Sequence, residues 1–235
     1  MDRNLENNFA DDVSTTVEAA LASRRSIRAF LERPVARDVI EDMLRLASFA
    51  PSGSNFQPWR VYVLSGNARW RLTQVLKEAY LSNVAPSRDY PYYMDPIEEP
   101  FLARRRLCGW GLYKKLEIER HEKERMTTQR ARNYDFYDAP VGLIFTIDKR
   151  LETGSYLDYG MFIQSVALAA RGKGLHSCIQ AAMSEYPDLV RRELGLSSDE
   201  LVLCGMALGY ADPKAIVNEY RPSRRPVEDF TSFIN

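Results

Sequence analysis

Two uninterrupted apolar runs in the second half of the chain limit the folds open to it. Val141 to Ile147 is VGLIFTI, and Leu201 to Tyr210 is LVLCGMALGY. Each run is far too short to cross a bilayer, and neither has a polar face. Strands without a polar face are typical of sheets that are buried on both sides. We therefore predict a central sheet covered by other structure on both faces.

Helical periodicity fills much of the remaining sequence. Apolar residues recur at helical spacing from Arg37 to Ala50, where Pro51 ends the pattern. Ser14 is expected to cap a short helix through Val17 and Leu21. Further strands are predicted over 59–64 and 175–183, and further helices over 67–80, 157–171 and 187–194. Because strands and helices do not alternate regularly, the pattern predicts an α+β fold rather than a doubly wound sheet.

Residues 82–135 differ in character from the rest. Four prolines interrupt the aromatic stretch YPYY and the acidic stretch EEP, and an intensely charged helical segment then runs from Arg104 to Arg132. We interpret this stretch as a lid-like insertion over the core. The insertion would belong to a single domain over residues 15–235, which a flexible segment, residues 1–14, precedes.

Composition excludes several classes of function. The 32 Lys and Arg residues balance 32 Asp and Glu residues, whereas a dedicated nucleic-acid-binding protein carries a basic excess. The two histidines, His121 and His176, cannot form a His-rich metal site, and we expect no metal. The chain has no apolar run long enough for a membrane span, and because its first residues are acidic and polar we expect no secretory signal. Three widely spaced cysteines favour a reducing compartment, so we expect a cytoplasmic protein without membrane or nucleic-acid partners.

Two basic clusters at opposite ends of the chain are candidates for binding an anion. Arg24, Arg25 and Arg28 bracket Ser26, and a second cluster contains Arg221, Arg224 and Arg225. Guanidinium groups match phosphate oxygens two at a time, and a serine hydroxyl adds a donor. Each cluster by itself is weak evidence, because arginine-rich turns are usually just solvated.

The segment PSGSNFQPW, residues 51–59, is a second candidate for ligand binding. Its small residues would expose backbone N–H groups to a ligand, and the amides of Asn55 and Gln57 would suit a heteroaromatic ring that carries carbonyls and nitrogens. An ordinary turn has the same composition. For Trp59 we favour packing in the core.

Together these motifs resemble the FMN-dependent nitroreductase family. The resemblance rests on RRSIRAF, APSGSNFQPW and the terminal LGYADP…RPSRRPVEDF, and it extends from about Thr15 to Phe230. The insertion resembles the branch that acts on nitrobenzoates and dinitroanilines. The resemblance implies a central, mostly antiparallel sheet flanked by helices, in an intertwined homodimer with FMN at the subunit interface. It also implies a ping-pong reaction in which NADPH or NADH reduces the flavin, leaves, and is replaced by a nitroaromatic compound that is reduced in two-electron steps.

The same resemblance assigns cofactor contacts, with the chemistry at flavin N5 and no catalytic side chain. Some relatives have a Glu-Gly pair near N5 where this chain has Ala181-Ala182, which leaves only a backbone donor there. Arg221 is a weaker phosphate candidate beside Arg224. The implied groups are the phosphate and ribityl contacts Arg24, Arg25, Ser26, Arg28 and Arg224, the loop that the partner subunit presents (Pro51, Ser52, Gly53 and Asn55), and the segment near N5 (Ile179, Gln180 and Ala181).

The aromatic residues of the insertion would wall a site for a flat substrate, with the run Arg104–Arg106 near its mouth. These candidates are Tyr90, Tyr92, Tyr93 and Phe101, and packing of the insertion itself explains them equally well. Three other functions stay open. They are a flavin-dependent reductive dehalogenase, an enzyme like dimethylbenzimidazole synthase, and a flavin-binding dimer without turnover.

Overall fold

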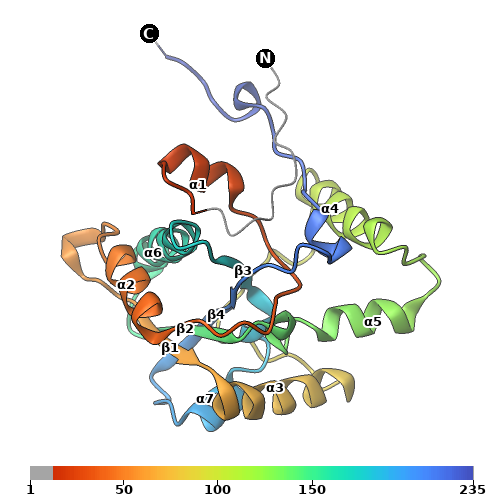
Figure 1. Ribbon diagram of the computed structural model, residues 1–235, viewed down its shortest axis with the longest axis horizontal. Coiled ribbons are helices and arrows are strands. Elements are labelled where there is room, and N and C mark those ends of the chain that lie inside the picture. The colour runs from red at the N-terminus through yellow and green to blue at the C-terminus, as the bar shows by residue number, and fades with distance from the viewer. Residues whose placement is uncertain (1–12, 235) are drawn as a thin grey trace.

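The computed structural model describes residues 13–234 and has one four-stranded sheet at its centre (Figure 1). The strand order is β1 (Arg60–Leu64), β2 (Val141–Asp148), β4 (Glu200–Gly209) and β3 (His176–Gln180), and every neighbouring pair is antiparallel. The prediction of an α+β fold with an antiparallel sheet is confirmed. The predicted N-terminal segment 1–14 lies outside the described residues, apart from Val13 and Ser14.

Strand β2 is packed on both faces, which explains why its sequence has no polar face. Leu143 and Phe145 pack on one side of the sheet with α2 (Arg37–Ala47) and α6 (Thr153–Arg171). Ile144 points to the other side, where α3 (Gly66–Leu81) and α7 (Pro187–Leu194) lie. Since successive side chains of a strand point to opposite faces, both sets must be apolar. Figure 1 shows the two helical layers on either side of the sheet.

The first helix, α1 (Val17–Ser23), begins where the sequence predicts it, but Ser14 does not cap it. The Thr16 hydroxyl accepts a hydrogen bond from the Ala19 N–H instead, because Thr16 directly precedes the first helical residue. Ser14 contacts other partners. Its N–H donates to the Arg171 carbonyl, and its hydroxyl lies 3.1 Å from that of Ser23.

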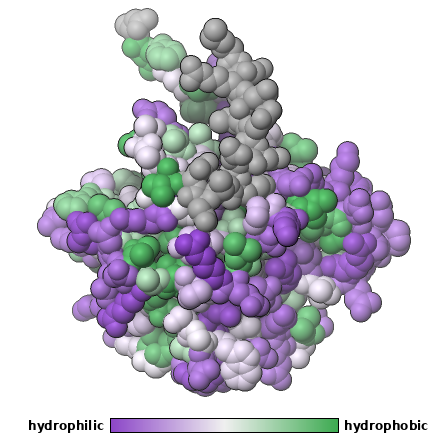
Figure 2. Space-filling view, in the orientation of Figure 1, coloured by the Kyte–Doolittle hydropathy of each residue, from purple (hydrophilic) through white to green (hydrophobic). Residues whose placement is uncertain are grey.

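The charged part of the insertion forms two helices rather than one continuous segment. Helix α4 (Phe101–Lys115) ends at a turn in which Glu117 has a φ of 53°, and α5 (Lys123–Ala131) follows. A small cluster of Tyr113, Ile118 and Met126 joins the two helices away from the main core. They lie beside the sheet, and Figure 2 shows mainly hydrophilic residues over this part of the visible face.

The two ends of the chain meet beside the outer strand β3. Ser26 forms a parallel bridge with Ser177, and Phe30 pairs with Ala211. The C-terminal segment then runs over α4, where a Cβ added to Gly111 would meet the Tyr220 hydroxyl at 2.6 Å. Position 111 therefore allows the close approach of this segment. Within residues 13–234, every helix is too short or too polar to span a bilayer.

Candidate active site

The segment that carries Arg24, Arg25, Ser26 and Arg28 is held in place by backbone contacts. The Ile27 N–H donates to the Ser177 carbonyl at 3.1 Å. The amide oxygen of fully buried Asn218 accepts hydrogen bonds from the N–H of Arg28 at 2.7 Å and from the N–H of Ala29 at 3.2 Å. Asn218 was not predicted from the sequence, because nothing in the sequence around it distinguishes it from a surface asparagine.

The structure brings the two arginine clusters together. Burial is the main cause that lowers the pKa of Arg24 below its ordinary value, and the charge of the Arg224 guanidinium lowers it further. Burial together with the charges of Arg221 and Arg171 lowers the pKa of Arg25 to about 10. The positive charges of these arginines repel one another, and a multivalent anion bound between them would relieve the repulsion. A phosphate group fits this donor set in charge, and its oxygens are suited to hydrogen bonds from guanidinium groups.

Arg225 does not join the site in this way. Its guanidinium group contacts Asp229 and lies over the Phe230 ring. Of the three predicted C-terminal arginines, Arg221 and Arg224 therefore lie near the N-terminal cluster, and Arg225 is engaged by its own segment.

A cavity of about 640 Å³ lies at the end of β3, beside this cationic segment. Arg28, Ile179, Gln180, Ala181 and Ala182 line it. Gln180 is 2% exposed, and its Nε2 donates to the Asn133 carbonyl at 2.7 Å, while its Oε1 has no hydrogen-bond partner among residues 13–234. Buried acceptors are normally paired, so a ligand with a ring N–H would complete this site. A flavin has such a donor, and its ring and phosphate match the two parts of the site.

Arg88, in the insertion, ties that segment to the end of β3. Its guanidinium donates to the Ala181 carbonyl at 2.8 Å and to the Ser184 hydroxyl at 2.5 Å, and it lies 2.5 Å from the Glu185 carboxylate. The hydroxyl of Tyr134 also donates to Glu185. Arg88 was missed at the sequence level because its partners follow it by more than 90 residues.

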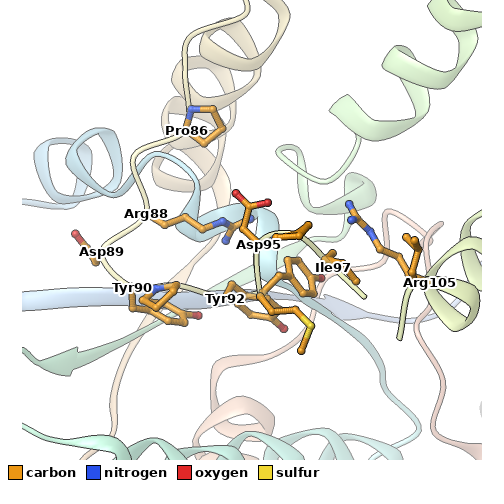
Figure 3. A pocket seen from close by; sticks show the side chains of 13 residues that line it. Pro86, Arg88, Asp89, Tyr90, Tyr92, Asp95, Ile97 and Arg105 are labelled. Atoms are coloured by element: carbon orange, nitrogen blue, oxygen red, sulfur yellow. The ribbon is translucent and has the colours of Figure 1, made fainter. Parts of the chain in front are cut away.

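The four predicted substrate contacts divide between neighbouring cavities. Tyr92 and Tyr93 line the cavity of about 640 Å³, and Tyr93 and Phe101 line a second one of about 600 Å³. Tyr90 lines only a third, about 690 Å³ in volume, which Figure 3 shows. Its hydroxyl donates to the Leu203 carbonyl at 2.5 Å, which places Tyr90 mainly against the sheet.

The loop of Pro51, Ser52, Gly53 and Asn55 lies apart from these residues. Its Gly53 N–H donates to the Asp158 carboxylate at 3.0 Å, and Ser54 and Asn55 have φ values of 50° and 60°. None of the four lines the cavities that contain Arg28 and Gln180. Trp59 stacks on Phe162 with a centroid distance of 4.7 Å, so its predicted packing role is confirmed.

His176 is buried and packs within the protein rather than at the candidate site. Its Nε2 lies 3.0 Å from Nη1 of Arg171, and burial together with the charges of Arg171 and Arg25 lowers its pKa to about 3. His176 is therefore neutral near pH 7. In the part of the chain that the structure describes, no group of three His, Cys, Asp or Glu residues is arranged to hold a metal ion.

Comparisons with known proteins agree with this geometry. A model of the Nitroreductase family matches residues 21–210. Nitrobenzene nitroreductase of Ectopseudomonas oleovorans is 40% identical over 225 residues, which cover 94% of this chain and 98% of that protein. 4-Nitrobenzoate reductase of Pseudomonas putida is 38% identical over 218 residues, with coverage of 92% and 95%. The crystal structure of the FMN- and NADPH-dependent nitroreductase NfnB from sphigopyxis sp. strain HMH superposes with a TM-score of 0.90, 34% identity, and coverage of 94% and 99%.

Proposed function

The chain belongs to the Nitroreductase family, and we propose on that basis that it is an FMN-dependent oxidoreductase that uses NADPH to reduce nitroaromatic compounds. The similar proteins named above act on nitrobenzene and 4-nitrobenzoate or depend on FMN and NADPH. One observation of this structure carries the proposal. Arginines from opposite ends of the chain form a cationic site directly beside a cavity at a strand end.

The residues present fit FMN in two places. Arg24, Arg25, Ser26 and Arg224 would hold its phosphate and ribityl chain, and Arg221 adds charge beside them. The end of β3, from Ile179 to Ala181, would face the ring and offer backbone N–H groups. Bound FMN would supply the hydride chemistry by which NADPH and a proton convert a nitro group to a nitroso group and water.

This chain's own side chains bind and orient the reactants. Arg28 lines the cavity and stays cationic, because the pKa of its guanidinium is raised despite burial, with the nearby Cys178 and Tyr137 favouring the charged form. A fixed cation at this position would stabilise negative charge on a bound flavin ring. Tyr92 and Tyr93 offer flat faces to an aromatic substrate. NADPH and the nitroaromatic compound would use this one cavity in turn, which is a ping-pong order.

We also propose that the protein acts as a homodimer. Large apolar side chains are exposed on α1, on both sides of the loop at 51–55 and along the C-terminal segment, and a second copy would cover them. They include Val17, Leu21, Phe49, Phe56, Phe230 and Phe233. In this arrangement Pro51, Ser52, Gly53 and Asn55 would reach the ring bound by the other subunit. Residues 82–135 would close over the same site as a lid.

A cytoplasmic location is part of the same proposal. Cys108, Cys178 and Cys204 are all free thiols, and two of them are buried. Such thiols are typical of proteins that work in a reducing compartment.

Flavin spectroscopy under anaerobic conditions tests the proposed reaction. The purified protein should be yellow, NADPH should bleach its visible absorbance, and 4-nitrobenzoate or nitrobenzene should restore it. Failure of both NADPH and NADH to bleach a bound flavin would rule the proposal out. Bleaching without reoxidation by either nitroaromatic compound would exclude the substrate class.

A further inference from the structure

The two cavities beside the strand end adjoin one another and are strongly cationic. They share Arg28, Tyr93, Arg105, Asn133 and Tyr137. The cavity of about 600 Å³ is also lined by Arg104 but by no Asp or Glu. The cavity of about 640 Å³ adds Arg88 and Arg130, with Glu185 as the one acidic residue on its wall. Positive side chains therefore dominate the space that the substrate would enter.

The contacts of these arginines differ. Arg88 is paired with Glu185, and Arg130 donates to the Tyr113 hydroxyl at 3.1 Å. The Arg105 guanidinium has no hydrogen bond or ion pair among residues 13–234, and it lies over the Tyr93 ring, 5.6 Å from the centroid. Figure 3 shows Arg105 and Arg88 entering the third cavity from opposite sides. Arg105 lines all three cavities, so it is a cation without a counter-ion at their junction.

We propose that Arg105 binds the carboxylate of a nitroaromatic acid and makes the enzyme prefer anionic over neutral nitroaromatic substrates. The inference rests on the proposed function. A guanidinium fork donates hydrogen bonds to both oxygens of a carboxylate, while the ring of Tyr93 next to it would pack against the aromatic ring of the substrate. Arg105 itself is exposed, so water screens part of this attraction. Of the acidic residues on the walls of the three cavities, Glu185 is paired with Arg88 and Asp89 with Arg191, and within residues 13–234 Asp95 forms no ion pair with Arg105.

The experiment compares 4-nitrobenzoate with its neutral methyl ester. The readout is the ratio of kcat/KM for the acid to kcat/KM for the ester, measured with saturating NADPH at low ionic strength. The variants are Arg105→Ala and Arg105→Lys, and the matched control is Arg106→Ala. Arg106 lies one position along α4 and lines neither cavity, so its removal changes the net charge equally. Flavin absorbance per protein shows whether each variant is intact.

In the wild type the acid should be preferred over the ester. In Arg105→Ala the ratio should fall about fivefold, which corresponds to losing one charged contact that water partly screens. Arg105→Lys should keep most of the preference, and Arg106→Ala should keep all of it. Raising the salt concentration should lower the acid-to-ester ratio of the wild type and leave that of Arg105→Ala nearly constant.

Three results would overturn the inference. The first is a wild type that reduces both compounds without preferring the acid, which would leave the proposed function standing. The second is a loss of preference in Arg106→Ala as large as that in Arg105→Ala, which would assign the preference to overall charge. The third is an Arg105→Ala variant with an unchanged acid-to-ester ratio and a raised KM for NADPH but not for NADH, which would assign Arg105 to the 2′-phosphate of the nucleotide.

Discussion

The amide oxygen of Asn218 lies 2.7 Å from the backbone nitrogen of Arg28 and accepts its hydrogen bond. The two residues are 190 positions apart in the chain. The same side chain donates to the carbonyls of Ala29 and Asp212 at 2.8 and 3.0 Å. One buried amide thus joins the N-terminal arginine segment to the C-terminal segment that carries Arg221 and Arg224. The proposed phosphate site depends on this junction.

Asn218→Ala should therefore lower both stability and flavin content. The substitution leaves buried backbone donors and acceptors unpaired, so we expect the free energy of unfolding to fall by about 2–3 kcal/mol. Urea unfolding of the flavin-free protein and the flavin absorbance of the purified protein check the two effects. Asn67→Ala, on the exposed side of α3, serves as the control and should change neither. Unchanged stability and flavin content in Asn218→Ala would contradict the prediction.

Arg224→Ala should weaken binding of FMN by about tenfold while leaving riboflavin binding nearly unchanged. The reason is that the charge of Arg224 acts beside Arg24, where we place the phosphate, and riboflavin lacks a phosphate. Titration of the flavin-free protein with both ligands, followed by flavin fluorescence, measures the difference. Arg225→Ala is the matched control, since Arg225 is engaged by Asp229. An equal loss of affinity for both flavins would show that Arg224 does not contact the phosphate.

His176 should make the protein less stable in mild acid. Burial, followed by the charges of Arg171 and Arg25, lowers its pKa to about 3 in the folded state, whereas an unfolded chain has an ordinary value of about 6.5. The unfolded state therefore binds the extra proton between these values. This group contributes no pH dependence above about pH 6.5, and below it the free energy of unfolding should fall by up to about 1.4 kcal/mol per pH unit.

The measurement is the free energy of unfolding between pH 7 and pH 4 for wild type, His176→Gln and His121→Gln. The wild-type slope contains the carboxylates as well, so the informative quantity is the difference between slopes. His176→Gln should show the shallower slope, and exposed His121→Gln should match the wild type. Identical slopes for all three proteins would mean that His176 protonates equally easily in both states.

Tyr93→Ala should raise KM for nitroaromatic substrates more than KM for NADPH. Tyr93 lines all three cavities and packs edge-on against Tyr92 at a centroid distance of 4.6 Å, so its loss removes an aromatic wall. Steady-state kinetics with nitrobenzene give both constants. Trp70→Ala, which removes an exposed ring on α3, provides the comparison. An equal rise in both constants for Tyr93→Ala would indicate general loosening of the insertion.

Local pattern was enough to place most of the regular structure. The run VGLIFTI predicted β2, and the helix predicted over 187–194 is α7, which ends at Gly195 in the left-handed region with a φ of 64°. The predictions were wrong where the local sequence allowed more than one helix start or helix end. Ser14 and Thr16 are both acceptable caps, and the choice depends on where the first helical turn begins. The charged stretch 104–132 has helix-forming residues throughout, and the turn at Glu117 is stabilised by packing between Tyr113 and Ile118 rather than by a breaker residue.

Residue type and order along the chain were sufficient to predict the family, the buried sheet and the two arginine clusters, because each of these depends on patterns within short stretches of sequence. Which groups meet in space depended on the tertiary structure. Asn218, Arg88 and Gln180 have partners 47 to 190 positions away in the chain, and nothing in their local sequence distinguishes them. Arg105 lies next to Arg104 and Arg106 in one charged run, and only the packed helix leaves it at the junction of the cavities without a counter-ion. Hydrogen bonds and ion pairs act over a few ångströms, so a chain reveals them only after folding has brought distant segments together.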